Sequence, residues 1–111
     1  MNVNFDTLNK DGSRRLLSGR KNGEAAYDYC GLRNFDKDGT LVLRSTGGLV
    51  VSNSYFLGML EKVFMLYNDA DELQKHIDCT GISELNKEEL AIGIKRLTTN
   101  PEINSLICKQ T

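Results

Sequence analysis

Residues 39–66 read GTLVLRSTGGLVVSNSYFLGMLEKVFML, and their pattern decides the fold class. A short apolar strand at 40–43 is followed by a paired-glycine turn and a second short strand at 49–51. A polar Ser-Asn-Ser group then opens a helix that we expect to run from Ser54 to about Tyr67. This helix is apolar on almost every side, so we expect it to be buried in a core or covered by a partner.

The sequence before this stretch predicts smaller elements. Residues 2–5 alternate polar and apolar side chains, which is a weak strand signal. An Asp-Gly turn at 9–12 follows, and Arg15–Leu17 is expected to be the return strand of a hairpin. Ser18 is the predicted N-cap of a helix that runs to about Cys30. Three residues are expected to form its buried face: Ala25, Ala26 and Tyr29.

The sequence after this stretch predicts one more strand and one more helix. Residues 72–79 alternate roughly and are expected to be a strand. Asn86 is the predicted N-cap of the next helix, with Glu89 completing a capping box. Its expected inner face is Leu90, Gly93, Ile94 and Leu97. Pro101 marks a break before a short terminal segment with Ile103, Leu106 and Ile107.

Strands that alternate with helices indicate an α/β domain. The length of 111 residues suits one domain, which we assign to residues 1–111. We expect a small mixed β-sheet of about four to five strands, flanked by three to four helices.

The charge balance argues against a general nucleic-acid binder. Fourteen Lys and Arg residues oppose fifteen Asp and Glu residues, which gives a net charge of −1. A basic cluster at Arg14, Arg15, Arg20 and Lys21 is interpreted as a solvated rim. No apolar run approaches the ~20 residues that a membrane helix needs, and residues 1–10 do not resemble a signal peptide. We therefore expect a cytoplasmic protein that does not contact membranes.

Residues with metal or catalytic chemistry are few and scattered. Cys30, Cys79 and Cys108 lack metal-ligand spacing and are expected to be reduced thiols. Residues 34–39 place oxygen side chains as an EF-hand loop does, but Ser45 stands where the loop needs a bidentate glutamate. A turn that feeds a strand is the preferred interpretation. We expect no metal and no cofactor.

His76 is the only histidine, and no nucleophile is spaced to pair with it. It falls in the predicted strand at 72–79, where a structural role is the simpler interpretation. Without a catalytic constellation, we expect a protein that is not an enzyme.

The candidate site is the start of the apolar helix, at Ser52, Asn53 and Ser54. The first N–H groups of a helix lack intrahelical partners and carry positive partial charge, so they hold capping side chains or anions. Simple capping is one interpretation of the three polar residues. Binding of a phosphate group, or phosphorylation of Ser54, is the other. Tyr55 and Arg44 complete the candidate contact set.

Residues 12–18, 41–56 and 73–97 carry a resemblance to a known family. They resemble the STAS-like family, small bacterial proteins related to anti-sigma-factor antagonists. Residues 12–18 resemble the segment that leads into the first helix of that family. Residues 41–56 resemble its strand, loop and helix start, and residues 73–97 resemble its closing strand and asparagine-led helix. Together the resemblance covers about residues 12–97.

The resemblance implies a mixed sheet flanked by helices, and a regulatory protein that binds a partner protein, a kinase-like ATPase of the anti-sigma type. The chain departs from the family at several positions. Leu57 and Gly58 stand where the family often has an acidic pair, and Ser52 stands at an aspartate. Arg44 stands where the family has an aspartate, and Asn53 stands at the family's phosphorylated serine, with Ser54 beside it.

The leading functional hypothesis is a regulatory module that binds a partner protein through residues 52–55. The alternative is a binder of a phosphorylated small molecule or nucleotide at the same helix start, with Arg44 as a clamp. A third hypothesis is a mobile-element protein that blocks a host system. A homodimer is also expected, through the apolar helix at 54–67 or the edge of the strand at 2–5.

Overall fold

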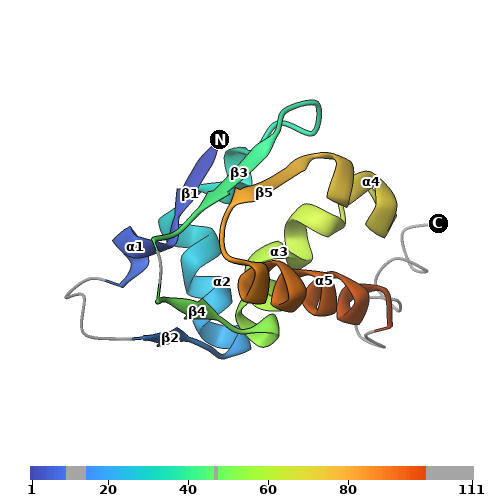
Figure 1. The fold of residues 1–111 in the computed structure, drawn as a ribbon. Helices are drawn as coiled ribbons and strands as arrows, with labels where there is room; N and C mark the ends of the chain where they lie inside the picture. Colours follow the sequence, from blue (N-terminus) through green and yellow to red (C-terminus); the bar gives the residue numbers. More distant parts are fainter. Residues whose placement is uncertain (10–14, 47, 100–111) are drawn as a thin grey trace.

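The expected alternation of strands and helices is present in the computed structural model, which describes residues 1–9, 15–46 and 48–99 (Figure 1). The described strands are β1 (Asn2–Asn4), β2 (Leu16–Leu17), β3 (Leu41–Arg44), β4 (Val50–Val51) and β5 (Ile77–Gly81). The described helices are α1 (Phe5–Leu8), α2 (Arg20–Tyr29), α3 (Asn53–Phe64), α4 (Ala70–Lys75) and α5 (Glu84–Thr99), with a 3-10 turn at Leu32–Asn34. The predicted α/β class is confirmed.

The strands are divided between two parallel sheets instead of forming one mixed sheet. A three-stranded sheet has the order β1-β3-β5, and β2 pairs with β4 in a two-stranded ribbon. The predicted hairpin is therefore wrong, because β2 pairs in parallel with β4 and places Leu17 beside Val51. Both of these side chains are buried, so this pairing adds two apolar residues to the core.

The three-stranded sheet packs on the core through one face only. Along β3, Leu41 and Leu43 are fully buried, whereas Val42 is half-buried and Arg44 is exposed. Val3 on β1 is buried between two exposed asparagines. β3 is the central strand of this sheet, and the alternation of burial along it shows that the second face is more exposed to solvent. Parallel sheets are usually covered on both faces.

Helix α3 is the centre of the core, because α2 and α5 pack against it. The α2–α3 contact is made through glycines: a Cβ added at Gly23 would overlap the carbonyl oxygen of Tyr55, and one at Gly58 would overlap that of Arg20. On the other side, a Cβ at Gly93 of α5 would lie 2.9 Å from the carbonyl oxygen of Asn53. Burial between two helices explains why α3 is apolar almost all round.

The predicted start and inner face of α2 are partly wrong. Gly19 occupies the N-cap position with φ 93°, and no side chain caps the helix. Ser18 contributes its carbonyl oxygen instead, which accepts from the Asn22 side chain at 2.8 Å. Gly23 and Ala26 are buried as a narrow stripe, whereas Ala25 is exposed and Tyr29 is 63% exposed. A helix that meets its neighbour backbone to backbone needs few large residues on the buried side.

The predicted strand at 72–79 is a helix followed by a strand. The side chain of Asp69 accepts from the backbone N–H groups of Asp71, at 2.8 Å, and Glu72. This cap starts α4, and β5 begins only at Ile77. The alternation of side chains over residues 72–79 is only approximate, and the Asp69 cap favours a helix at its start instead of a strand.

The start of α5 also differs from the prediction. The helix begins at Glu84, and the hydroxyl of Ser83 accepts from the Asn86 N–H at 3.2 Å, so Ser83 has the capping role given to Asn86. Asn86 is buried inside the first turn, where its side chain accepts from Val51 N–H and donates to the Leu49 carbonyl, both at 2.9 Å. The predicted inner face of α5 is confirmed at all four positions.

Helix α3 ends at Phe64, earlier than predicted, and residues 65–67 form turns. Asn68 has a left-handed backbone with φ 56°. Most of the predicted 9–12 turn, and the segment after Pro101, lie outside the described residues. Among the described helices, none has the length and apolar character needed to cross a membrane.

Candidate functional site

The start of α3 is capped as the sequence indicates. Ser52 is the N-cap, with φ −75° and ψ 159°, and its hydroxyl accepts from the Tyr55 N–H at 3.3 Å. The Ser52 carbonyl accepts the first intrahelical bond, from Phe56 N–H at 3.1 Å. The apolar run after the cap supplies the buried face that holds the helix in place.

A carboxylate from α5 occupies the same helix end. One oxygen of Glu89 accepts from the backbone N–H of Asn53 and from its side-chain amide, both at 3.2 Å. A negative charge at a helix N-terminus is favourable because it meets the positive end of the helix dipole. A carboxylate of the protein itself therefore occupies the position that one interpretation of the sequence gives to an anion.

Arg96 lies seven residues, or about two turns, after Glu89 on the same side of α5, and it binds the side chains of Asn53 and Ser54. One guanidinium nitrogen donates to the Asn53 side-chain oxygen at 2.6 Å and to the Ser54 hydroxyl at 3.0 Å. Arg96 is exposed, whereas Asn53, Ser54 and Glu89 are half-buried. We name these four residues, Asn53, Ser54, Glu89 and Arg96, the helix-start surface.

Tyr55 belongs to the core and does not take part in this surface. Its side chain is 4% exposed, and its ring meets that of Phe5 edge to face with centroids 6.3 Å apart. Burial, with a smaller contribution from Cys30, raises the pKa of the Tyr55 phenol to about 12. The candidate role of Tyr55 as a contact residue is thus replaced by a packing role.

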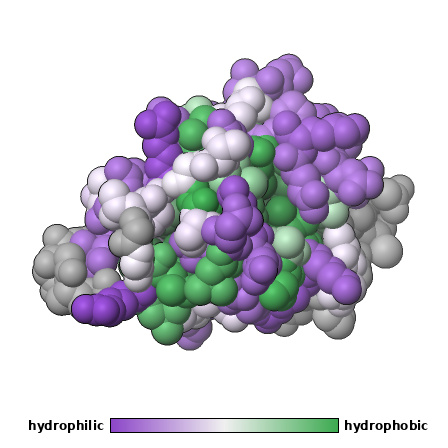
Figure 2. All heavy atoms as spheres, in the orientation of Figure 1, coloured by the Kyte–Doolittle hydropathy of each residue, from purple (hydrophilic) through white to green (hydrophobic). Residues whose placement is uncertain are grey.

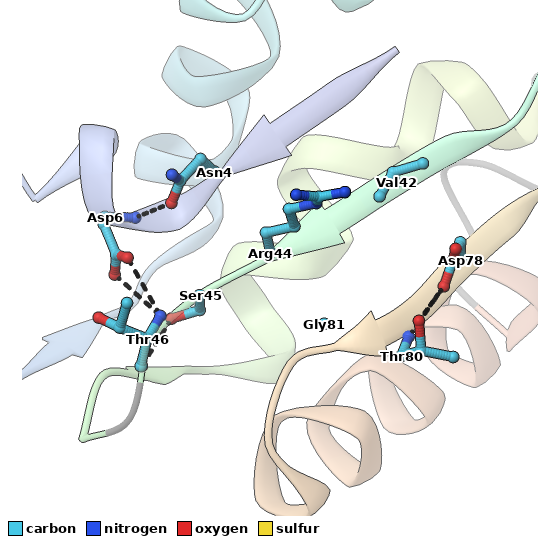
Figure 3. A pocket seen from close by; sticks show the side chains of 9 residues that line it. All are labelled: Asn4, Asp6, Val42, Arg44, Ser45, Thr46, Asp78, Thr80 and Gly81. Carbon is cyan, nitrogen blue, oxygen red and sulfur yellow. Dashed lines mark hydrogen bonds between the residues drawn. The ribbon is translucent and has the colours of Figure 1, made fainter.

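Arg44 lies apart from the helix start, on the open face of the three-stranded sheet. It lines an open hollow of about 380 Å³ together with residues from the carboxyl ends of all three strands. Figure 3 shows the Arg44 side chain lying along β3, between Asn4 of β1 and Asp78 of β5. None of residues 52–55 lines this hollow.

The polar groups around this hollow are partly tied to one another. The Asp6 carboxylate accepts from the Thr46 N–H at 3.1 and 3.2 Å, which fixes the loop after β3 (Figure 3). The Asp78 carboxylate accepts from the Thr80 hydroxyl at 2.6 Å and from its N–H. These bonds, with a smaller contribution from the charge of Arg44, lower the pKa of Asp78.

The structure therefore brings together Ser52, Asn53 and Ser54, and it separates them from Arg44. Sequence reasoning assigned Glu89 to a capping box and did not include Arg96 among the candidate site residues. The signal that marks them is Gly93, which stands between them and lets the backbone of α5 approach α3. Side chains four residues before and three residues after a contact glycine lie on the same side of the helix.

His76 has a structural environment. Its Nδ1 lies 2.7 Å from the Gly39 carbonyl oxygen, which can only accept, so Nδ1 carries a proton. The imidazole stacks on Tyr67 at 4.9 Å, and the Tyr67 hydroxyl donates to the Lys37 carbonyl at 2.6 Å. Together the two rings hold the turn that leads into β3. Within that turn, the Asp36 side chain accepts from the Asp38 N–H at 3.0 Å.

Comparisons of the chain with models of protein families, with curated proteins and with solved structures find no match. The similarity to the STAS-like family therefore remains a prediction from the sequence.

Proposed function

We propose that this protein is a non-enzymatic regulatory module that binds a partner protein through the helix-start surface. The observation that carries the proposal is the pair of bonds from Arg96 to Asn53 and Ser54. They join two helices at the surface and present a cation with two hydrogen-bonding side chains. Arginine in such a setting is enriched among the residues that dominate protein–protein binding energies.

The two helices that carry the helix-start surface are closely packed. They meet at Gly93, where a Cβ would be only 2.9 Å from the Asn53 carbonyl, so neither helix can slide without losing this contact. A surface that is already ordered loses little conformational entropy on binding, which favours affinity. This argument supports recognition of a folded partner.

A free phosphate or nucleotide is a weaker candidate at this position. The Asn53 N–H is bonded to Glu89 and the Tyr55 N–H is bonded to Ser52. A small anion would have to displace a carboxylate held by two hydrogen bonds, and it would meet the negative charge of that carboxylate. For the same reason, phosphorylation of Ser54 would place a second anion close to Glu89, with Arg96 as the compensating charge.

The resemblance to STAS-like proteins gives the proposal its biological setting. It suggests a bacterial, cytoplasmic regulator with a kinase-like ATPase as its partner. The mobile-element hypothesis names a different setting for the same surface, and the genes beside this one would distinguish the two.

The test is affinity purification of the tagged protein from its native cells, followed by quantitative mass spectrometry. We expect a stoichiometric partner that is lost with Arg96→Ala and with Asn53→Ala. Lys37→Ala, in an exposed turn outside the helix-start surface, is the matched control and should retain it. Recovery of the same proteins with all three variants, or of none with the wild type, would contradict the proposal.

A second candidate function rests on the position of Arg44. The hollow that it lines lies at the carboxyl ends of parallel strands, where α/β proteins commonly bind small ligands. Its lining of guanidinium, carboxylate and hydroxyl groups suits a small polar ligand, so the small-molecule hypothesis moves from the helix start to this hollow. A thermal-shift screen with nucleotides and sugar phosphates tests it. Stabilisation that disappears with Arg44→Ala supports it, and unchanged melting curves with every ligand would rule it out.

A further inference from the structure

Helix α5 exposes two large aliphatic side chains that its contact with the core does not use. Leu85 is 51% exposed and Ile92 is 45% exposed. They are separated by seven residues, or about two helical turns, so they lie on one line along the helix. Figure 2 shows hydrophobic atoms over α5 among hydrophilic ones. The buried line of α5, through Leu90, Ile94 and Leu97, is separate.

This exposed line has the spacing of a helix-pairing seam. All its members are exposed, and they are spaced alternately by three and four residues: Leu85, Glu88, Ile92, Lys95 and Thr99. Such spacing keeps one face of a helix against another helix over several turns. We name these five residues the α5 seam.

The charges along α5 are asymmetric. Glu84 and Glu88 lie in the N-terminal half, and Lys95 and Arg96 lie in the C-terminal half. Lys87 is the exception in the acidic half, and it is bonded to Glu84 at 2.9 Å. A helix that is acidic at one end and basic at the other is complementary to an antiparallel copy of itself. The helix dipoles also attract each other in that orientation.

We propose that two copies of this chain associate through antiparallel packing of the α5 seam, with the two-fold axis at Ile92. Ile92 then packs on Ile92 of the second copy, and Leu85 packs near Thr99. Glu88 lies opposite Lys95 of the second copy, and the symmetry repeats this ion pair on the other side of the axis. A self-complementary surface of this kind is what a two-fold interface requires.

The charges also favour this alignment of the two α5 helices over the neighbouring alignment of the same seam. If the axis lay midway between Leu85 and Ile92, the acidic Glu88 and Glu89 of the two copies would face each other. Like charges at close range would oppose that packing. The Ile92 register removes this repulsion and replaces it with attraction between Glu88 and Lys95.

The test is sedimentation velocity of the purified chain at about 5 μM and about 500 μM, because a single helix pair is a small interface and favours micromolar dimers. We expect a concentration-dependent dimer that Ile92→Asp abolishes. Glu88→Lys and Lys95→Glu should each weaken the dimer at least tenfold, and the double variant should restore it. Lys21→Glu, on the exposed side of α2, is the control and should leave it unchanged.

Three outcomes would overturn the proposal: a monomer at both concentrations, a dimer that tolerates Ile92→Asp, or a double variant as weak as the single ones. Every substituted side chain is exposed, so circular dichroism should show folded protein throughout. The purified chain contains no partner, and the result is therefore independent of the proposed partner binding.

Discussion

Helix α3 meets α2 and α5 through two contacts of different kinds. The α2 contact depends mainly on shape, since Gly23 and Gly58 let two backbones touch, and one ion pair between Arg20 and Glu61 accompanies it. The α5 contact uses a single glycine, Gly93, and polar side chains take a larger part in it, with Asn86, Glu89 and Arg96 bonded to α3 or to the strand before it. The difference shows that α2 fixes the position of α3, while α5 both positions it and supplies the chemistry at its exposed end.

The largest expected effect comes from breaking the α2 contact. Gly58→Ala places a Cβ against the Arg20 carbonyl, and Gly23→Ala does the same at Tyr55. Since backbone cannot move aside as a side chain can, we expect a loss of about 4 kcal/mol or more for each. Gly93→Ala meets a wider space and should lose about 2 kcal/mol. Urea denaturation measures the free energy of unfolding of the three variants, with the exposed Ala25→Ser as the control. Equal losses at all three glycines would contradict the prediction.

A smaller effect is expected from the buried amide on the α5 side. Asn86→Leu keeps the approximate volume but leaves the Val51 N–H and the Leu49 carbonyl without partners, which should cost about 3 kcal/mol. Asn22→Ala, which removes an exposed amide bonded to Ser18, should cost less than about 0.5 kcal/mol. Thermal and urea unfolding check both variants. Similar losses would mean that burial of the Asn86 amide is unimportant.

The bonds at the exposed end of α3 should contribute less to stability. Ser52→Ala removes the N-cap and should cost about 1 kcal/mol. Arg96→Ala removes a surface donor and should cost about 0.5 kcal/mol. A large loss of stability for Arg96→Ala would give this residue a structural role and weaken the proposed binding role.

The smallest expected effect is a pH dependence on the α2 side. Glu61 bonds Arg20 at 2.7 Å and its side chain is 13% exposed. Burial raises the pKa of Glu61 above its ordinary value of 4.5, and Arg20 offsets this only in part. The stability that this group contributes is therefore complete below pH 4.5 and is lost as the pH rises through the raised pKa.

Glu61→Gln, which does not ionise, should gain stability relative to the wild type between pH 4 and pH 7. Urea unfolding of both proteins across this range measures the difference. A constant difference at every pH would show that the pKa of Glu61 is the same in the folded and unfolded chains.

Much of the fold could be predicted from the sequence, because the patterns that indicate its main helices and its central strand lie within short segments. The apolar residues of α3 and of the inner face of α5 recur at helical spacing, and the Ser52 cap precedes an uninterrupted apolar run. The strand at 40–43 is continuous and apolar, and it is central to the sheet. In each case, neighbouring residues in the sequence carry enough information.

The wrong predictions concern segments whose structure depends on residues that are far away in the sequence. Leu16 and Leu17 pair with a strand more than thirty residues away, and no pattern in their own neighbourhood indicates this. The same holds at the candidate site, where Glu89 and Arg96 reach α3 from another helix, while Arg44 lies on the open face of the sheet. Sequence reasoning located the helix start but could not determine which side chains meet there.

The amide of Asn86 has a consequence for aggregation. It bonds the Val51 N–H and the Leu49 carbonyl, which lie on the edge of β4 away from β2, and these are the groups that a neighbouring strand would use. One side chain thus closes an edge rich in β-branched residues, the kind of edge that recruits strands from other molecules. If α5 detached while the rest of the domain stayed folded, this edge would be uncovered. The resistance of this protein to aggregation should therefore follow the local stability of α5 more closely than the stability of the whole domain.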